Sequence, residues 1–234
     1  MFNPQFSHRS EPLGTGARVE IYDHLLTDPA GLVDLAQQHR LAFLQAQTNA
    51  FPGLELPLPP AALAPWRDWF SSTAKRHFGV RRVVDIQGRL SMVTAQPDQL
   101  APVQRICHRD RLETEPGELA IAGVLYLFEQ EALGGTNFFT AREPERINER
   151  IARWAQMTAT AFEVDTEWPP SYMLAANQHF EHLLTVAPRF NRLLLYRGDV
   201  FHGSAIAAPH LLCDQPTQGR LTLNLFMRCK RSAA

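Results

Sequence analysis

The sequence predicts a mainly β fold with flanking helices, in which helices come first and a β-rich half follows. In the first third of the chain, apolar residues recur at helical spacing. From residue 82 onward they alternate with polar residues, which is the period of a half-buried strand. The last stretch, residues 220–228, has one apolar and one polar face. Such a strand is typical of a barrel whose interior holds a charged ligand rather than a packed core.

Length and composition predict one soluble domain. The chain has 234 residues, of which 45% are hydrophobic and 20% charged, as in ordinary globular proteins. We expect a single domain over residues 1–234, with an N-terminal support at 1–98 and a β core at 99–230 that carries a helical insertion at about 141–190. The net charge of −1 gives no reason to expect nucleic acid or an anionic membrane as a partner.

Two features of the sequence favour a cytoplasmic protein. The first residues lack the basic stretch and apolar run of a signal peptide, and no window approaches eighteen uninterrupted apolar residues. The cysteines Cys107, Cys213 and Cys229 are odd in number and lack CxxC spacing, so neither a disulfide framework nor a zinc site is predicted. We expect Cys107 to be a buried, inert thiol on the strand face opposite His108.

The N-terminal part is expected to contain a short strand at 19–22 and two helices. Asp28 caps the first helix, with Pro29 at its first position. The apolar face of this helix comprises Leu32, Val33, Ala36 and Phe43. Residues 51–60 are too rich in proline for a helix and form a loop or an extended crossing. The second helix carries Leu63, Trp66, Phe70 and Ala74 on one face and ends just before Gly79.

The β-rich half is expected to contain strands at 82–92, 119–128, 192–196, 199–202 and 220–228. The stretch 119–128 is almost continuously apolar, so it fits either a strand covered on both faces or a buried helix. Pro116-Gly117 before it and Gly134-Gly135 after it favour the strand.

The insertion is predicted to be helical. Glu143-Pro144 begins a helix whose apolar face comprises Ile147, Ile151, Trp154 and Thr158. This helix could border the mouth of the site and influence substrate choice, or it could buttress the outer face of the sheet. A further short helix is predicted around Phe180, Leu183 and Leu184, where His179 and His182 are interpreted as surface histidines.

The residues that carry chemistry fall in one order along the β-rich half: His108 and Asp110, then His202, then Arg220 and Thr222. A His-x-Asp pair on an extended segment puts both side chains on one side of the backbone. Together with a distant histidine, it makes the facial set that suits non-haem Fe(II) and leaves adjacent positions open for a 2-oxo acid and O2. Each residue alone is also explained as a core histidine, a surface aspartate or a sheet-edge arginine.

The same half of the chain, about residues 100–230, resembles the Fe(II)/2-oxoglutarate-dependent dioxygenases, specifically the prolyl 4-hydroxylase-like branch. The motifs that carry the resemblance are His108-x-Asp110, Tyr126-Leu127 at a strand end, the Gly134-Gly135-Thr136-Asn137-Phe138 turn, His202 and Arg220. The resemblance implies a double-stranded β-helix, or jelly roll. It also implies that His108, Asp110 and His202 are iron ligands. Arg220 would then pair with the far carboxylate of 2-oxoglutarate, helped by the Tyr126 hydroxyl and by Thr222.

The resemblance implies a hydroxylase that uses O2 and releases succinate and CO2. Its substrate is expected to be a small molecule or a peptide, and prolyl hydroxylation does not follow from the fold. Two alternatives are a non-catalytic β-helix binding module and a cupin-like metalloenzyme that needs no oxo acid. The intact ligand set together with Arg220 argues against the binding module, because a decayed site would tend to lose one of these residues. The cupin-like enzyme would not need an inward-facing arginine on the last strand.

Overall fold

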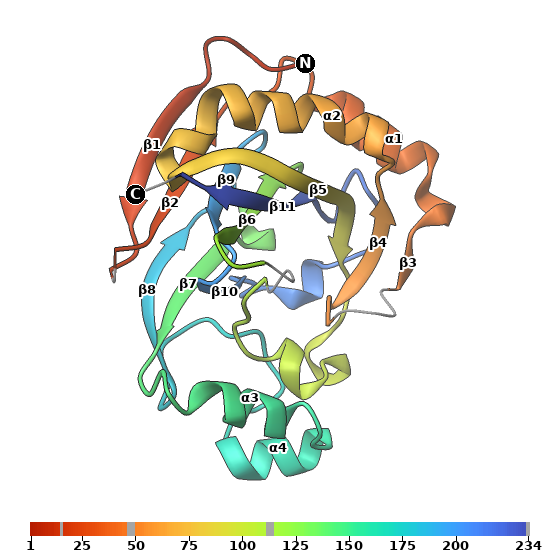
Figure 1. The fold of residues 1–234 in the computed structure, drawn as a ribbon. Helices are drawn as coiled ribbons and strands as arrows, with labels where there is room; N and C mark the ends of the chain where they lie inside the picture. The colour runs from red at the N-terminus through yellow and green to blue at the C-terminus, as the bar shows by residue number, and fades with distance from the viewer. Residues whose placement is uncertain (15, 46–49, 111–114, 233–234) are drawn as a thin grey trace.

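The computed structural model describes residues 1–14, 16–45, 50–110 and 115–232. Two antiparallel sheets form its centre, with helices at opposite ends of the molecule (Figure 1). The large sheet has the order β1-β2-β9-β6-β11-β5-β4-β3, and the small sheet has the order β10-β7-β8. No helix among the described residues is long and apolar enough to cross a membrane. The two antiparallel sheets confirm the predicted mainly β architecture.

The strands of the large sheet are β1 (Ser7–Pro12), β2 (Arg18–Asp23), β3 (Leu44–Gln45), β4 (Gly53–Pro57), β5 (Val80–Val93), β6 (Glu118–Tyr126), β9 (Leu193–Arg197) and β11 (Arg220–Arg231). The strands of the small sheet are β7 (Thr136–Ala141), β8 (Phe180–Val186) and β10 (Phe201–Ser204). The α-helices are α1 (Ala30–Gln38), α2 (Pro60–Trp69), α3 (Ile147–Trp154) and α4 (Ala159–Thr166). A π-helical turn, η2 (Phe70–Ala74), and a 3-10 turn, η3 (Lys75–Phe78), continue α2 towards β5.

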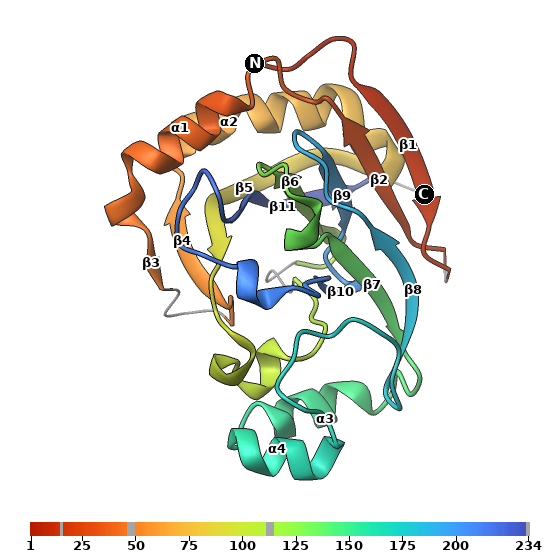
Figure 2. The ribbon, with the colours of Figure 1, turned by 180° about the vertical axis from the view of Figure 1, so that it is seen from behind.

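Helices α1 and α2 cover one face of the large sheet, as the two opposite views agree (Figure 2). The apolar side chains of this face of β11 are buried with those of α2 in one core. They include Leu221, Leu223, Leu225 and Met227 from β11, and Leu63, Trp66 and Trp69 from α2. Burial of this face is the main stabilising contribution of the N-terminal helices, because apolar area removed from water dominates folding free energy.

The other face of β11 points towards the small sheet and carries the polar residues. Arg220, Thr222, Asn224 and Phe226 all line a cavity between the two sheets. The alternation of the strand therefore places a packed core on one side and a ligand-sized space on the other, as the sequence predicted.

Most predicted elements are present, but the chain around residue 180 is a strand and not a helix. β8 pairs with β7, and the register shifts between Phe138 and Phe139 so that Leu183 has no direct partner. This bulge interrupts the period of two, and the apolar residues of β8 therefore take on a spacing that mimics a helix. His179 and His182, predicted to be on the surface, are half-buried against Trp154 and Phe139 respectively.

Two predicted helices are present but end earlier than the sequence predicted. The helix after Glu143 ends at Trp154, and Thr158 begins the separate helix α4 as its N-cap, accepting a hydrogen bond from the Ala161 amide at 3.2 Å. Helix α1 ends at Gln38, so Phe43 reaches the core from beyond the helix.

Candidate metal centre

His108 and His202 face each other across a short antiparallel bridge between the segment before residue 110 and β10. The amide of each residue donates to the carbonyl of the other at 2.8 Å. This pairing brings the ring centroids to 4.4 Å from each other. Because side chains alternate on an extended chain, Cys107 lies on the opposite side, fully buried among apolar residues. Burial raises the pKa of the Cys107 thiol, as expected for an inert cysteine.

Asp110 completes the cluster, two residues after His108. Its Oδ2 lies 3.3 Å from Nε2 of His202, and its Oδ1 lies 3.8 Å from Nε2 of His108. One ligand atom from each of the three residues lies within 4.8 Å of the others. The structure therefore brings together His108, Asp110 and His202 as the sequence predicted, with one ligand atom of each close to the other two.

The orientation of His202 is fixed by a backbone contact. Its Nδ1 lies 3.0 Å from the carbonyl oxygen of Val200. A carbonyl can only accept, so Nδ1 carries the proton and donates, and Nε2 is left as the ligand atom. Metal-binding histidines in proteins are oriented by this kind of outer contact.

The two histidines differ in their affinity for protons. Burial and the neighbouring His202 lower the pKa of His108 to about 4, although 56% of its side chain is open to the cavity. Burial also disfavours the charged form of His202, but attraction to Asp110 outweighs it and raises the pKa of His202. The Asp110 carboxyl is desolvated too, yet His202 and His108 hold its pKa below the usual value. These shifts favour the carboxylate form of Asp110 and the neutral form of His108, and they favour protonation of His202 over protonation of His108.

The cluster lies in the wall of a cavity of about 430 Å³ between the two sheets. Residues from both sheets line this space, among them Arg89 and Asn224 from the large sheet and Ser204 from the small one. A cavity of this size suits a small-molecule ligand. Arg89 is already paired, with its Nε 2.6 Å from Oε1 of Glu55.

Arg220 is a buried cation in the wall of the same cavity. Its side chain is held by Nε donating to the carbonyl of Gly134 at 3.1 Å and Nη2 donating to that of Gly135 at 2.8 Å. The residue is 3% exposed, and no carboxylate among the described residues pairs with it. The predicted inward orientation is therefore observed.

The Gly134-Gly135 turn has a role that the sequence did not reveal. Gly134 has a φ of +84°, and a Cβ atom there would lie 2.2 Å from the carbonyl oxygen of Ala205. A Cβ atom on Gly135 would lie 2.0 Å from the carbonyl oxygen of Val186. Glycine is therefore required at both positions for the turn to approach neighbouring backbone and direct its carbonyls at Arg220.

Thr222 and Tyr126, the two residues predicted to assist Arg220, differ in whether they line the cavity. Thr222 lines the cavity, with its hydroxyl 3.4 Å from the carbonyl of Ser91. Tyr126 is fully buried and is not among the residues that line the cavity. Its hydroxyl is hydrogen-bonded to Oγ1 of Thr136 at 2.7 Å, and Thr136 does line the cavity. Tyr126 therefore reaches the cavity through Thr136.

The helical insertion packs against the segment that leads to His108. Trp154 is fully buried with Ile106 and Cys107, the residues just before His108. Arg105 is also buried, and its Nη1 pairs with Oε1 of Glu163 in α4 at 2.6 Å. Helices α3 and α4 therefore buttress the His108 segment, and it is Tyr172 and Met173, later in the insertion, that line the cavity.

The chain matches a protein family over residues 4–227, and this family is described as "Family of unknown function (DUF6445)". No curated protein matches the chain.

Several solved structures are similar to this chain at low sequence identity. A prolyl-4-hydroxylase from Pseudomonas putida is 14% identical, with a TM-score of 0.47 and coverage of 91% of this chain and 92% of that one. The non-haem alpha-ketoglutarate-dependent carbocyclase SnoK from nogalamycin biosynthesis is 13% identical, with a TM-score of 0.49 and coverage of 92% and 83%. HygX from Streptomyces hygroscopicus, solved with nickel and 2-oxoglutarate bound, is 12% identical, with a TM-score of 0.45 and coverage of 91% and 82%. The predicted resemblance is thus confirmed as structural similarity.

Proposed function

The chain belongs to DUF6445, a family of unknown function, and we propose that it is a non-haem Fe(II)- and 2-oxoglutarate-dependent oxygenase. In this proposal it hydroxylates a C–H bond of a small molecule or peptide and releases succinate and CO2. The two facing sheets form a double-stranded β-helix within a single domain. His108, Asp110 and His202 are the iron ligands, and their two nitrogens and one oxygen suit this metal.

Arg220 is the observation that carries the proposal. A buried charge without compensation costs about 3–5 kcal/mol. The Arg220 guanidinium has two carbonyl partners and the Phe128 ring but no carboxylate among the described residues, so it is expected to bind an anion. It shares one cavity with the metal cluster. A ligand that spans both needs one end that chelates a metal and another that carries a carboxylate. 2-Oxoglutarate has both, and a guanidinium fork matches a carboxylate in shape and charge.

The chain's own residues would position the reactants. Bound iron supplies the redox chemistry that couples O2 reduction to decarboxylation of 2-oxoglutarate and oxidation of the substrate. Arg220 and Thr222 would hold the far carboxylate, and Tyr126 would fix Thr136 beside it. Phe226 and Asn224 line the remaining cavity, and we assign this part to the substrate.

Anaerobic spectroscopy tests the proposal before any substrate is known. Fe(II) and 2-oxoglutarate added together should give a visible charge-transfer band that neither gives alone, because the keto acid must chelate the metal. Exposure to O2 should then consume 2-oxoglutarate and yield one succinate for each CO2, with turnover increased by the true substrate in a library of amino acids, peptides and metabolites. Iron binding without any effect of 2-oxoglutarate would refute the co-substrate and favour a cupin-like metalloenzyme.

A further inference from the structure

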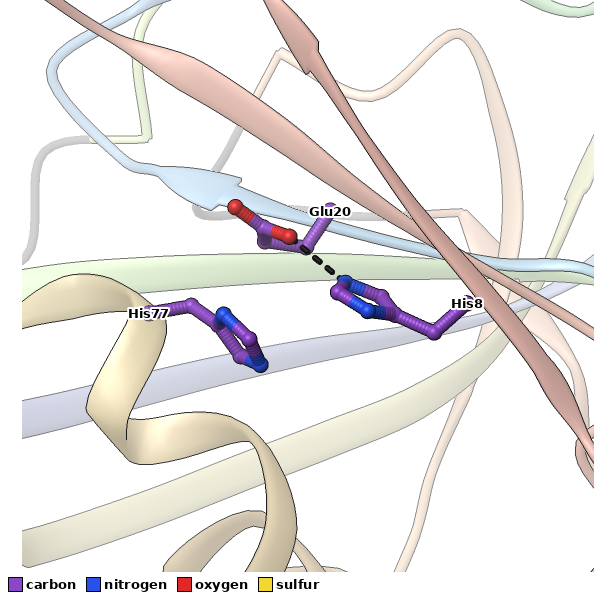
Figure 3. A group of neighbouring side chains, drawn as sticks. All are labelled: His8, Glu20 and His77. Atoms are coloured by element: carbon purple, nitrogen blue, oxygen red, sulfur yellow. Dashed lines mark hydrogen bonds and ion pairs between the residues drawn. The ribbon is translucent and has the colours of Figure 1, made fainter.

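A second group of two histidines and one carboxylate lies outside the cavity. It consists of His8 from β1, Glu20 from β2 and His77 from η3, and one ligand atom from each lies within 4.8 Å of the others (Figure 3). None of the three residues lines the cavity of the first cluster. In Figure 3 the two imidazole rings lie on the same side of the Glu20 carboxylate, with His77 reaching in from the helical segment.

Strand pairing sets the first two residues beside each other. In the antiparallel β1–β2 pair, His8 lies opposite Tyr22 and Ser10 lies opposite Glu20. These four side chains share one face, so His8 and Glu20 are diagonal neighbours. Nε2 of His8 lies 2.7 Å from Oε2 of Glu20.

His77 comes from a different part of the chain, at the end of the helical segment that begins with α2. Gly79, with a φ of +61°, ends this segment in the left-handed conformation that glycine adopts readily. The ring centroids of His77 and His8 are 4.7 Å from each other. The cluster therefore joins the N-terminal hairpin to a segment more than fifty residues further along the chain.

Neighbouring residues orient the carboxylate. Ser10 donates from its hydroxyl to Oε1 of Glu20 at 2.7 Å, and Arg18 donates from Nε to the Ser10 hydroxyl at 2.6 Å. These contacts leave Oε2 for the histidines. The side chain of Glu20 is only 2% exposed, whereas that of His8 is 27% exposed and leaves a path from solvent. Tyr22 stacks on His8, with 4.6 Å between the ring centroids. The buried hydroxyl of Tyr22 has no hydrogen-bond partner among the described residues.

We propose that His8, Glu20 and His77 form a second metal site, which takes a divalent cation such as Zn²⁺ with a solvent molecule as its fourth ligand. Two imidazoles and a carboxylate favour zinc and its neighbours over calcium and magnesium, which prefer oxygen ligands. Ligand atoms around a tetrahedral zinc with bonds of about 2.0–2.1 Å are about 3.3 Å apart, so the 2.7 Å contact needs to widen only slightly.

The role of this metal is structural. Among the described residues, none of the three ligands lines the main cavity. The cation nearest the carboxylate is Arg18, which already contacts Glu20 and the Ser10 hydroxyl. Bound metal would tie the β1–β2 hairpin at the edge of the large sheet to the helical segment that covers that sheet. A metal that binds only the folded chain stabilises it, and this stabilisation increases with the logarithm of the metal concentration above the dissociation constant.

Calorimetric titration of the metal-free protein with Zn²⁺ tests the site by stoichiometry. The parent should bind two equivalents, one at each cluster. His77→Ala should bind one, and a His108→Ala/His202→Ala variant should also bind one, with no zinc bound by the combination of all three substitutions. His39→Ala is the matched control, because His39 is exposed at the end of α1 and lies outside both clusters, so it should keep two equivalents.

Hydrogen exchange gives an independent measurement. Zinc should slow amide exchange across β1, β2 and η3 in the parent and in the His108→Ala/His202→Ala variant, but not in His77→Ala. Ser10→Ala should weaken zinc binding at this site by about 10- to 100-fold, as is typical for loss of an outer contact to a ligand. Two equivalents retained by His77→Ala, or no zinc bound by the His108→Ala/His202→Ala variant, would overturn the proposal.

Discussion

Two clusters in this molecule present the same donors, two imidazoles and a carboxylate, in different surroundings. His108, Asp110 and His202 lie in the wall of the cavity that also holds Arg220. His8, Glu20 and His77 lie between a hairpin and a helical turn, outside that cavity. The Asp110 carboxylate has only the two histidines as ion-pair partners among the described residues, whereas Glu20 is also held by a serine hydroxyl.

The difference shows that a donor set does not define a function by itself. A reactive metal needs open positions that face a space for a substrate, whereas an open position that faces only solvent provides none. The first cluster has that space together with a buried cation, Arg220. The second joins two segments of the fold. The following predictions use each cluster as the control for the other, from the largest expected effect to the smallest.

Loss of His202 should have the largest effect. His202→Ala removes one of three ligands and should abolish the charge-transfer band formed by Fe(II) and 2-oxoglutarate under anaerobic conditions, as should His108→Ala and Asp110→Ala. His77→Ala should leave the band intact, because His77 belongs to the other cluster. A band that persists in His202→Ala would mean that the third ligand is assigned to the wrong residue.

Arg220→Ala should separate co-substrate binding from metal binding. Loss of a bidentate charged contact worth about 3–4 kcal/mol should weaken 2-oxoglutarate binding by about 100- to 1,000-fold, with Fe(II) affinity nearly unchanged. Arg220→Lys should fall between, because an ammonium keeps the charge but lacks the planar fork. Titration of 2-oxoglutarate, followed by the absorbance of the iron complex, measures both variants. Unchanged affinity in Arg220→Ala would remove the anchor of the co-substrate.

The pH dependence of iron binding should reveal the unequal histidines. Iron needs neutral imidazoles, and the raised pKa of His202 makes it the first to be protonated as pH falls. Below that pKa, affinity should fall about tenfold per pH unit, the slope for one competing proton. A second proton should compete only near pH 4, where His108 titrates. Iron affinity measured across the pH range checks this. A fall of about a hundredfold per pH unit immediately below the His202 pKa would mean that two protons compete there, and it would contradict the unequal pKa values of the two histidines.

Tyr126→Phe should have the smallest effect. The Tyr126 hydroxyl contacts Thr136 and lies behind the cavity wall, so its loss removes one neutral hydrogen bond, worth about 0.5–1.5 kcal/mol. The affinity for 2-oxoglutarate should therefore fall by about 2- to 10-fold, without change in Fe(II) binding. A loss much larger than that, in the same titration as for Arg220, would indicate a direct bond from Tyr126 to the co-substrate.

Local pattern was sufficient where one segment determines its own geometry. His108 and Asp110 share a side because alternate residues of an extended chain do so, and Cys107 is buried on the other side for the same reason. The alternation of β11 separated the apolar core from the cavity wall, and so placed Arg220 correctly. The bulge in the β7–β8 pair at Phe138 and Phe139 interrupts the alternation of apolar and polar residues. Reasoning from local pattern therefore predicted a helix where the structure has β8.

The sequence by itself therefore determined the mainly β class, the His-x-Asp pair and the inward arginine. Only the tertiary structure decided that Tyr126 acts through Thr136, that the Gly134-Gly135 carbonyls hold Arg220, and that His77 meets His8 and Glu20. Periodicity fixes the face on which a side chain lies. Which distant side chain it meets depends on strand register and on the packing of whole elements, and both are set by the burial of the complete core.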